Sequence, residues 1–299
     1  MSEPIRLTLA YPNEKQQRFL ECTAKYIAFG GARGGGKSWA VRTKAILLAL
    51  GYAGIRLLIV RRTYQELESN HIRILRPQLA QVAEYKATTR TFTFLNGSTL
   101  EFGYCASDGD MDRYQGAEYD VIFLDECTQL REQWMRQFAA CLRGVNDFPK
   151  RIYYTCNPGG PGHSYIKRLF IDRRFEPGEN PDDYVFIPAR VTDNKALLAA
   201  QPDYLKQLEA LPRRLRQAWL EGRWDIFQGQ VFSEFTDDPT HYADRRFTHV
   251  IPAFDIPREW RVYRSYDFGY AKPFSCAWWA MDFDGRLYRI LELYGLSLL

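Results

Sequence analysis

The chain has 299 residues, of which 46% are hydrophobic and 25% are charged. This composition excludes a disordered, collagen-like or coiled-coil chain and fits one large domain, or one domain and part of a second. The net charge of +4, from 40 basic and 36 acidic residues, is too small to demand a nucleic-acid partner and does not oppose one.

Cysteine usage and hydropathy narrow the class of protein further. None of the six cysteines forms a CxxC pair or has a histidine at metal-ligand spacing, which argues against zinc-finger and thioredoxin-like motifs. The N-terminus does not resemble a signal peptide, so we expect buried thiols rather than disulfides. No apolar run approaches the roughly 20 residues that a membrane span needs. We therefore expect a cytoplasmic protein without a membrane partner.

Strand-like and helical patterns alternate up to about residue 175. A hairpin is expected around Asn96-Gly97, between strand-like runs at 91–95 and 99–102. This alternation predicts an α/β fold with a mainly parallel, doubly wound sheet. The other predicted strands cover residues 25–29, 55–60, 120–124 and 151–155, and the predicted helices cover 38–50, 66–82 with a break at Pro77, and 129–142.

The pattern changes in the last third of the chain. Residues 176–183 read as a surface loop, and a basic amphipathic helix interrupted at Pro212 follows within 202–222. Strands are then expected at 262–268, 274–283 and 287–293, the last two joined by an Asp284-Gly285 turn. We therefore assign residues 1–240 to a first domain, with a helical linker subdomain over about 176–235. Residues 241–299 form a second, incomplete domain, because three strands alone cannot bury both faces of a sheet.

A glycine-rich stretch between the first strand and the first helix matches GxxxxGK[ST]. Its backbone N–H groups would surround the phosphates of ATP, its lysine would reach the β and γ oxygens, and its serine would offer a hydroxyl to Mg²⁺. The pattern predicts a P-loop NTPase. The expected nucleotide-binding residues are Gly31, Ala32, Arg33, Gly34, Gly35, Gly36, Lys37 and Ser38.

Two acids follow the buried run at 120–124, at the edge of the sheet where the phosphate loop is expected. Asp125 is predicted to hold Mg²⁺ through its water shell, and Glu126 to act as the general base on the attacking water. A carboxylate beside the metal ligand favours hydrolysis over transfer to a small molecule. The sequence therefore predicts an ATPase.

Several arginines are candidates for contact with phosphate. Arg33 would stabilise charge on the γ-phosphoryl group, in cis or toward a neighbouring subunit, or would pair with an acid and shape the loop. Arg113 competes for the role of arginine finger. Arg61 and Arg62 follow the second strand, where a basic pair meets a phosphate or is solvated.

Five segments together resemble the large terminase subunit of tailed bacteriophages and prophages. They occur in the order of that family and cover nearly the whole chain. The segments are GARGGGKS (31–38), VRRTYQEL (60–67), RYQGAEYDVIFLDE (113–126), TCNP (155–158) and LEGRWDIFQGQVF (220–232).

This resemblance implies an N-terminal packaging ATPase followed by a nuclease of ribonuclease H-like fold, of which 241–299 would supply only the first strands. Gln16 would read the adenine edge, with Gln17 as its rival; an exposed helical glutamine is the alternative. Thr155 and Asn157 occupy the position of the coupling motif that senses the γ-phosphate, or else form a simple turn after a strand.

Asp267 occupies the position of the first metal-binding acid of the nuclease, which would use Mg²⁺ or Mn²⁺. The remaining acids of the family lie farther along than Leu299. We therefore expect the chain to end within the nuclease domain and not to cleave DNA alone.

The leading functional hypothesis is an ATP-driven motor that translocates double-stranded DNA into a procapsid. The resemblance implies a homo-oligomeric ring that works with a portal protein and a small terminase subunit. The basic residues 213–216 are a candidate DNA surface, or a solvated helix face. The alternatives are a helicase-type or repair ATPase acting on DNA, a small-molecule phosphotransferase, and a prophage remnant that binds ATP without doing work.

Overall fold

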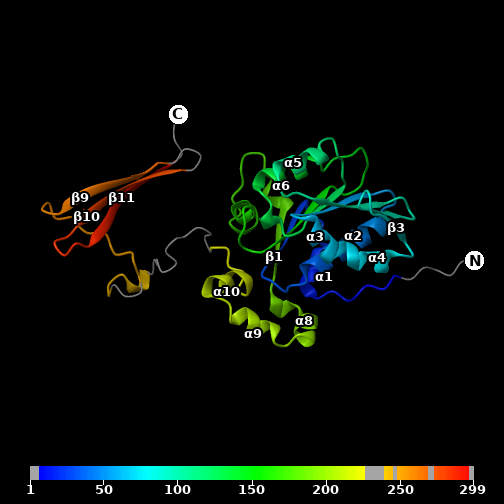
Figure 1. Cartoon of the computed structure of the whole chain (residues 1–299), viewed down its shortest axis with the longest axis horizontal. Coiled ribbons are helices and arrows are strands. Elements are labelled where there is room, and N and C mark those ends of the chain that lie inside the picture. Colours follow the sequence, from blue (N-terminus) through cyan, green and yellow to red (C-terminus); the bar gives the residue numbers. More distant parts are fainter. Residues whose placement is uncertain (1–6, 226–238, 245–247, 269–272, 296–299) are drawn as a thin grey trace, which may run out of the picture. The chain divides into compact units, whose positions relative to one another are not determined.

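The computed structural model describes residues 7–225, 239–244, 248–268 and 273–295. It divides the chain into two compact units, 1–229 and 230–299 (Figure 1). Residues 226–232 of the terminase-like segment 220–232 lie outside the described part, as do residues 296–299.

The first unit is built on an eight-stranded sheet with the order β3-β4-β5-β2-β6-β7-β1-β8. From β5 to β8 all neighbours are parallel, whereas β3, β4 and β5 pair antiparallel at one edge. The strands are β1 (Tyr26–Gly31), β2 (Arg56–Arg61), β3 (Ala83–Lys86), β4 (Thr91–Phe94), β5 (Thr99–Tyr104), β6 (Val121–Leu124), β7 (Arg151–Cys156) and β8 (Tyr184–Ala189).

The central strands are apolar along their whole length because helices cover both faces of the sheet. Every residue of β6 is buried, as are the last five residues of β2 and of β7. Two separate hydrophobic clusters result, one on each side of the sheet. The doubly wound α/β fold expected from the sequence is thereby confirmed, including the hairpin between β4 and β5.

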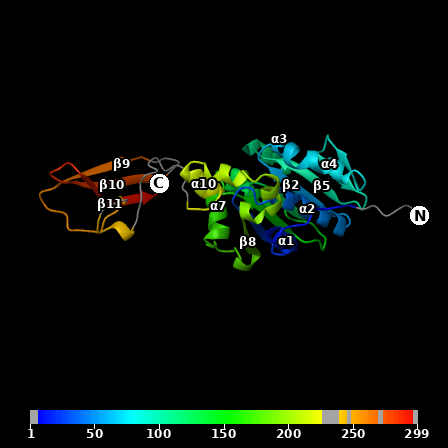
Figure 2. The ribbon, with the colours of Figure 1, turned by 90° about the horizontal axis from the view of Figure 1, so that it is seen from below.

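Helices α1, α2 and α4 lie on one face of the sheet, and α5 and α6 lie on the other (Figure 1). Helix α1 packs beside both α2 and β8 (Figure 2). The α-helices are α1 (Glu14–Glu21), α2 (Lys37–Gly51), α3 (Tyr64–Leu67), α4 (Arg73–Leu79), α5 (Asp108–Met111), α6 (Glu132–Ala140), α7 (His163–Ile166), α8 (Lys195–Ala200), α9 (Tyr204–Glu209) and α10 (Arg213–Trp219). Five-residue π-helical segments cover Glu68–Ile72 and Lys167–Ile171.

Three predictions need correction. Pro77 does not break its helix but lies inside α4, which continues to Leu79; a proline removes only one backbone hydrogen bond, and the buried Leu75 and Leu79 anchor the turn. Strand β3 was missed because only two of its four residues face the core side. Strand β8, within the expected helical linker subdomain, was also not predicted; it pairs in parallel with β1 before helices α8 to α10 begin.

The described part of the second unit contains an antiparallel three-stranded sheet with the order β11-β10-β9. Its strands are β9 (Arg261–Asp267), β10 (Phe274–Met281) and β11 (Leu287–Gly295). Asp282 accepts the N–H groups of Asp284 and Arg286 at the turn that joins β10 to β11. This meander and its turn agree with the sequence prediction. No helix in the described ranges combines the length and the apolar character that crossing a bilayer requires.

Gly30, near the end of β1, lies very close to the backbone of the neighbouring strand β7. Its φ is +155°, and a Cβ atom there would lie 1.9 Å from the carbonyl oxygen of Cys156 on the neighbouring strand. Because that neighbour is backbone in the middle of the sheet, it cannot move aside cheaply.

We expect Gly30→Ala to lower the free energy of unfolding by about 2–4 kcal/mol. Gly51→Ala is the matched control: a Cβ atom there meets nothing within 4 Å, so its change should stay within about 0.5 kcal/mol. Equilibrium denaturation in urea measures both. Equal stability of the two variants would contradict the close packing of β1 on β7.

Candidate active site

The glycine-rich loop joins β1 to α2 and leaves the start of that helix open. Gly36 is the N-terminal cap residue with φ +76°, and no side chain caps the first turn. A Cβ atom at this position would lie 2.3 Å from Gln16 Nε2. The unpaired N–H groups and the helix dipole together form a site for an anion such as phosphate.

Not every amide of the predicted loop faces this site. Ala32 donates its N–H to the carbonyl of Ala189, and Arg33 donates to the carbonyl of Trp219, at 3.1 and 2.8 Å. These two amides therefore tie the loop to the protein rather than surround a phosphate, which corrects the expectation for them. The part of the predicted phosphate-binding backbone that these two contacts leave available is the second half of the loop, Gly34 to Ser38.

Lys37 lies across the loop with a buried side chain. Its Nζ atom donates to the carbonyl of Ala32 at 2.5 Å and to Asn157 Oδ1 at 2.8 Å. Burial lowers the pKa of the ammonium group. The lysine thus joins the phosphate loop to the segment after β7, the two segments that the sequence placed in one site.

Asp125 follows β6 and is completely buried. Burial alone would raise the pKa of its carboxyl group, but the charge of Arg61 and the hydrogen bond from His71 hold that pKa well below its usual range. Ser38 Oγ lies 3.4 Å from Asp125 Oδ2, and the hydroxyl of Thr155 donates to Asp125 Oδ1. The carboxylate is therefore a fixed negative charge beside the start of α2.

Glu126 has a left-handed backbone conformation, with φ +53° and ψ +45°. This conformation is uncommon for a residue with a side chain and is concentrated at functional sites. The backbone N–H of Glu126 donates to Thr155 Oγ1 at 2.8 Å, which holds the turn. Its side chain is 41% exposed, so this acid, unlike its neighbour Asp125, is accessible to water and substrate.

The end of β7 and the loop that follows it contact the acids on one side and the phosphate loop on the other. Thr155 bridges Asp125 and Glu126, while Asn157 accepts from Lys37. The hydroxyl of Thr128 holds the carbonyl of Asn157 at 2.9 Å. Both residues of the predicted coupling motif are thus in contact with the candidate site.

Two side chains contact Asp125 in a way that the sequence did not predict. Arg61 was expected to meet phosphate or solvent; it is buried, and its Nε atom lies 2.7 Å from Asp125 Oδ2. His71 is also buried, with Nε2 2.7 Å from the same oxygen, and burial lowers the pKa of its imidazole. A signal was available for His71, which continues the helical spacing of Leu67 and Leu75 on the apolar face.

The other candidates predicted from the sequence are two glutamines of α1 and two arginines. Gln16 is buried and donates to the carbonyl of Gly36 at 3.2 Å, whereas Gln17 is exposed and bonds to Glu21 on its own helix. The Arg33 guanidinium lies 3.3 Å from the ring centre of Trp219 on α10. Arg113 is paired with Asp110.

Asp267 is the last residue of β9, exposed and paired in register with Ser275. Within the described ranges, no group of three or more His, Cys, Asp or Glu side chains converges as a metal site. The nuclease role of Asp267 therefore stays a prediction. The basic segment 213–216 begins α10, and its contact with DNA also stays a prediction.

Mg²⁺ prefers oxygen ligands and commonly keeps several waters and phosphate oxygens in its shell. The Ser38 hydroxyl, the Asp125 carboxylate beside it and the exposed carboxylate of Glu126 provide such oxygens at one edge of the sheet. This donor set fits Mg²⁺, with Ser38 and Asp125 as the residues that would hold it.

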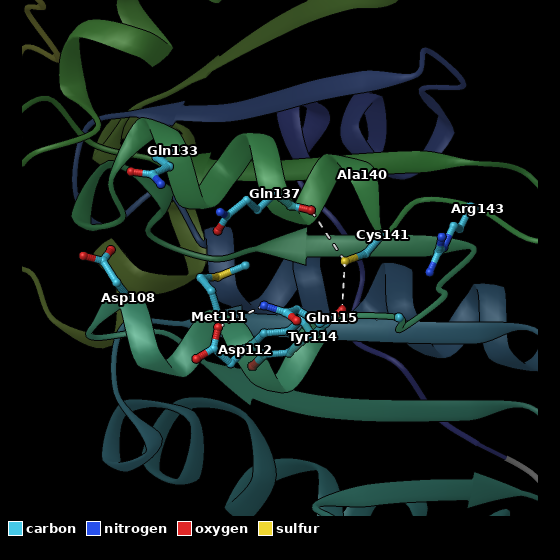
Figure 3. Close-up of a pocket in the computed structure, with 11 residues that line it drawn as sticks. Asp108, Met111, Asp112, Tyr114, Gln115, Gln133, Gln137, Ala140, Cys141 and Arg143 are labelled. Atoms are coloured by element: carbon cyan, nitrogen blue, oxygen red, sulfur yellow. Dashed lines mark hydrogen bonds between the residues drawn. The ribbon is translucent and has the colours of Figure 1, made fainter.

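A cavity of about 440 Å³ lies between the segment 108–116 and helix α6 (Figure 3). Cys141 donates its thiol to the carbonyls of Tyr114 and Gln137 in its wall. No residue of the phosphate loop and neither acid of the site lines this cavity. The candidate active site is instead the loop and carboxylate edge described above.

The sequence of this chain matches the model of a known protein family. Residues 28–236, more than half of the chain, match the family described as terminase large subunit, T4-like virus type, N-terminal. No curated protein sequence gives a significant match.

Solved structures are similar over most of the chain. The large terminase of a thermophilic bacteriophage in complex with ADP is 20% identical, with a TM-score of 0.58, over 94% of this chain and 68% of that one. The same terminase in complex with ATP-gamma-S is 19% identical, with a TM-score of 0.57, over 94% and 67%. The ATPase domain of the Thermus phage P74-26 large terminase is 16% identical, with a TM-score of 0.52, over 72% and 94%. At these identities the likeness establishes the fold.

Thr155→Val should test the bridge between the two acids. The substitution keeps the shape of the side chain but leaves the N–H of Glu126 and one oxygen of Asp125 without a partner, so we expect a loss of about 1–3 kcal/mol in the free energy of unfolding. Thr93→Val, at an exposed position of β4, is the control and should be neutral. Urea denaturation of both variants measures the difference; unchanged stability of Thr155→Val would rule the bridge out.

Proposed function

This chain belongs to the family of terminase large subunits, the ATPase motors of viral DNA packaging, and we propose that it hydrolyses ATP at the site around Asp125. The observation that carries this proposal is the convergence of three features at one end of the sheet: the phosphate loop, a buried carboxylate suited to hold a metal ion, and an accessible acid. Ser38, Asp125 and Glu126 meet there from α2 and from the end of β6.

The open start of α2 and Lys37 would bind the phosphate chain of the nucleotide. A phosphate oxygen would replace Ala32 and Asn157 as the partner of the Lys37 ammonium group, which already lies in the loop. Ser38 and Asp125 would hold Mg²⁺, which when bound neutralises and orients the β- and γ-phosphates. Gln16, fixed against Gly36, would read the adenine edge.

Glu126 would act as the general base. Its side chain is accessible, and its backbone is held by Thr155, so the carboxylate can accept a proton from a water molecule that attacks the γ-phosphate. Asp125 cannot take this role because it is fully buried, and its low pKa makes the carboxylate a weak base that does not readily accept a proton.

Thr155 and Asn157 would couple hydrolysis to movement. Loss of the γ-phosphate changes the partners available to Lys37, and Lys37 is bonded directly to Asn157. Thr155, near the end of β7 and two residues before Asn157, accepts the backbone N–H of Glu126. A change at the phosphate would therefore reach the loop after β7 through two side-chain contacts.

The family also suggests the setting in which the motor works. We propose a homo-oligomeric ring in the host cytoplasm that engages a portal protein, a small terminase subunit and double-stranded DNA. Arg33 or Arg113 would serve as the arginine finger, in cis or between subunits. Asp267 would bind Mg²⁺ or Mn²⁺ in the nuclease module.

Two substitutions separate binding from turnover. Lys37→Ala should weaken the binding of ATP-γ-S by at least about tenfold, because a charge-assisted contact to phosphate is lost. Glu126→Gln should bind ATP-γ-S like the wild type but hydrolyse ATP at least about 100-fold more slowly. Calorimetry and phosphate release measure the two properties. Glu84→Gln, at an exposed position of β3, is the matched control; wild-type turnover by Glu126→Gln would remove Glu126 as the base.

Duplex DNA should stimulate ATP hydrolysis by the wild-type chain, and the stimulation should fall steeply between low and moderate salt because the contacts are mainly to phosphates. Steady-state phosphate release with duplex, single-stranded or no DNA measures this effect. Stimulation by single strands alone would favour a helicase-type or repair ATPase instead.

A further inference from the structure

Arg61, the last residue of β2, contacts three oxygen groups of the active site with one guanidinium group. Its Nε atom lies 2.7 Å from Asp125 Oδ2, and its Nη2 atom lies 3.3 Å from Ser38 Oγ and 3.5 Å from Glu126 Oε1. The side chain is 6% exposed. A buried cation therefore lies among the hydroxyl and the two carboxylates that meet at this edge of the sheet.

These three groups are the ones to which the proposed function assigns the metal ion and the attacking water. A guanidinium group offers several donors in a fixed planar fork, so it can satisfy oxygens from different segments at the same time. A divalent cation among the same oxygens would lie within a few ångströms of this charge, where repulsion between cations is strong.

The other polar groups of the site do not share this position. Lys37 is directed to Ala32 and Asn157, and Arg42 donates to the carbonyl of Asn70. His71 contacts Asp125, through Nε2. Of the cations described here, Arg61 is the one that reaches all three oxygen groups.

Asp125 does not depend on Arg61 alone. His71 also contacts Oδ2, and the hydroxyl of Thr155 donates to Oδ1. These contacts keep the carboxylate in place when the guanidinium moves or is replaced by a neutral side chain. The arrangement therefore allows an exchange of partners at Asp125 without loss of its position.

We propose that Arg61 is a positioning residue that competes with Mg²⁺ for Ser38 and Asp125. Its guanidinium holds the three groups together and gives up its bonds to Ser38 and Asp125 as the metal–nucleotide complex binds. The Mg²⁺ concentration at which nucleotide binds is then set by this exchange. The inference rests on the proposed function, because it requires a nucleotide with Mg²⁺ at this site.

The test is a Mg²⁺ titration of ATP-γ-S binding, followed by calorimetry, with an arm in EDTA. For Arg61→Gln, the Mg²⁺ concentration that gives half-maximal binding should fall by about threefold or more relative to the wild type, because a competing charge is removed. Arg61→Lys keeps the charge but lacks the fork, so its midpoint should lie between the two. Arg62→Gln removes the same charge from the exposed neighbour and should keep the wild-type midpoint.

Thermal melting establishes that each variant is folded. A Mg²⁺ midpoint unchanged in Arg61→Gln, or shifted equally in Arg62→Gln, would overturn the exchange. If Arg61→Gln does not fold, a wild-type Mg²⁺ midpoint in Arg61→Lys would overturn the exchange. Failure of the wild-type chain to bind ATP-γ-S at any Mg²⁺ concentration would instead overturn the proposed function, and the inference with it.

Discussion

The structure depends most on one buried negative charge, the carboxylate of Asp125. An ionised carboxylate away from water is costly unless opposite charge and hydrogen bonds surround it. Four segments supply those partners: Ser38 lies in the first turn of α2, Arg61 ends β2, His71 lies in the π-helical segment Glu68–Ile72, and Thr155 lies near the end of β7. The backbone N–H of Asp125 also donates to Val60 on β2. Satisfying one charge thus fixes the relative positions of the elements that form the site.

The same arrangement links the proposed nucleotide site to parts of the fold that do not touch it. Thr155 and Asn157 connect the acids and Lys37 to the loop after β7. On its outer side the phosphate loop is held by the later helices: Asn194 donates to the carbonyl of Gly34 at 2.7 Å, and the ring of Trp219 lies against Arg33. A conformational change in the loop would therefore alter contacts both in the sheet and in α8 to α10. A motor needs such connections in order to convert hydrolysis into movement.

Local sequence patterns predicted much of the fold and of the candidate site. Contacts between segments that are distant in the sequence could not be predicted from such patterns. The phosphate loop and the acids after β6 follow from residue types at fixed spacing, and continuous apolar runs predicted the central strands. Arg61 was expected to meet a phosphate or solvent; its burial against Asp125 was not predicted, because an arginine at a strand end is usually solvated and this contact depends on a carboxylate 64 positions away. The left-handed backbone of Glu126 is likewise imposed by tertiary contacts. Strand β8 escaped notice because its pairing with β1 involves segments more than 150 residues apart.

The most direct measurement is a crystal structure of the chain with ATP-γ-S and Mg²⁺. We expect the phosphates on the amides of Gly34 to Ser38, the metal beside Ser38 and Asp125, and the Glu126 carboxylate directed toward the γ-phosphate position. A nucleotide bound elsewhere, or an Asp125 that faces neither the metal nor the phosphates, would contradict it.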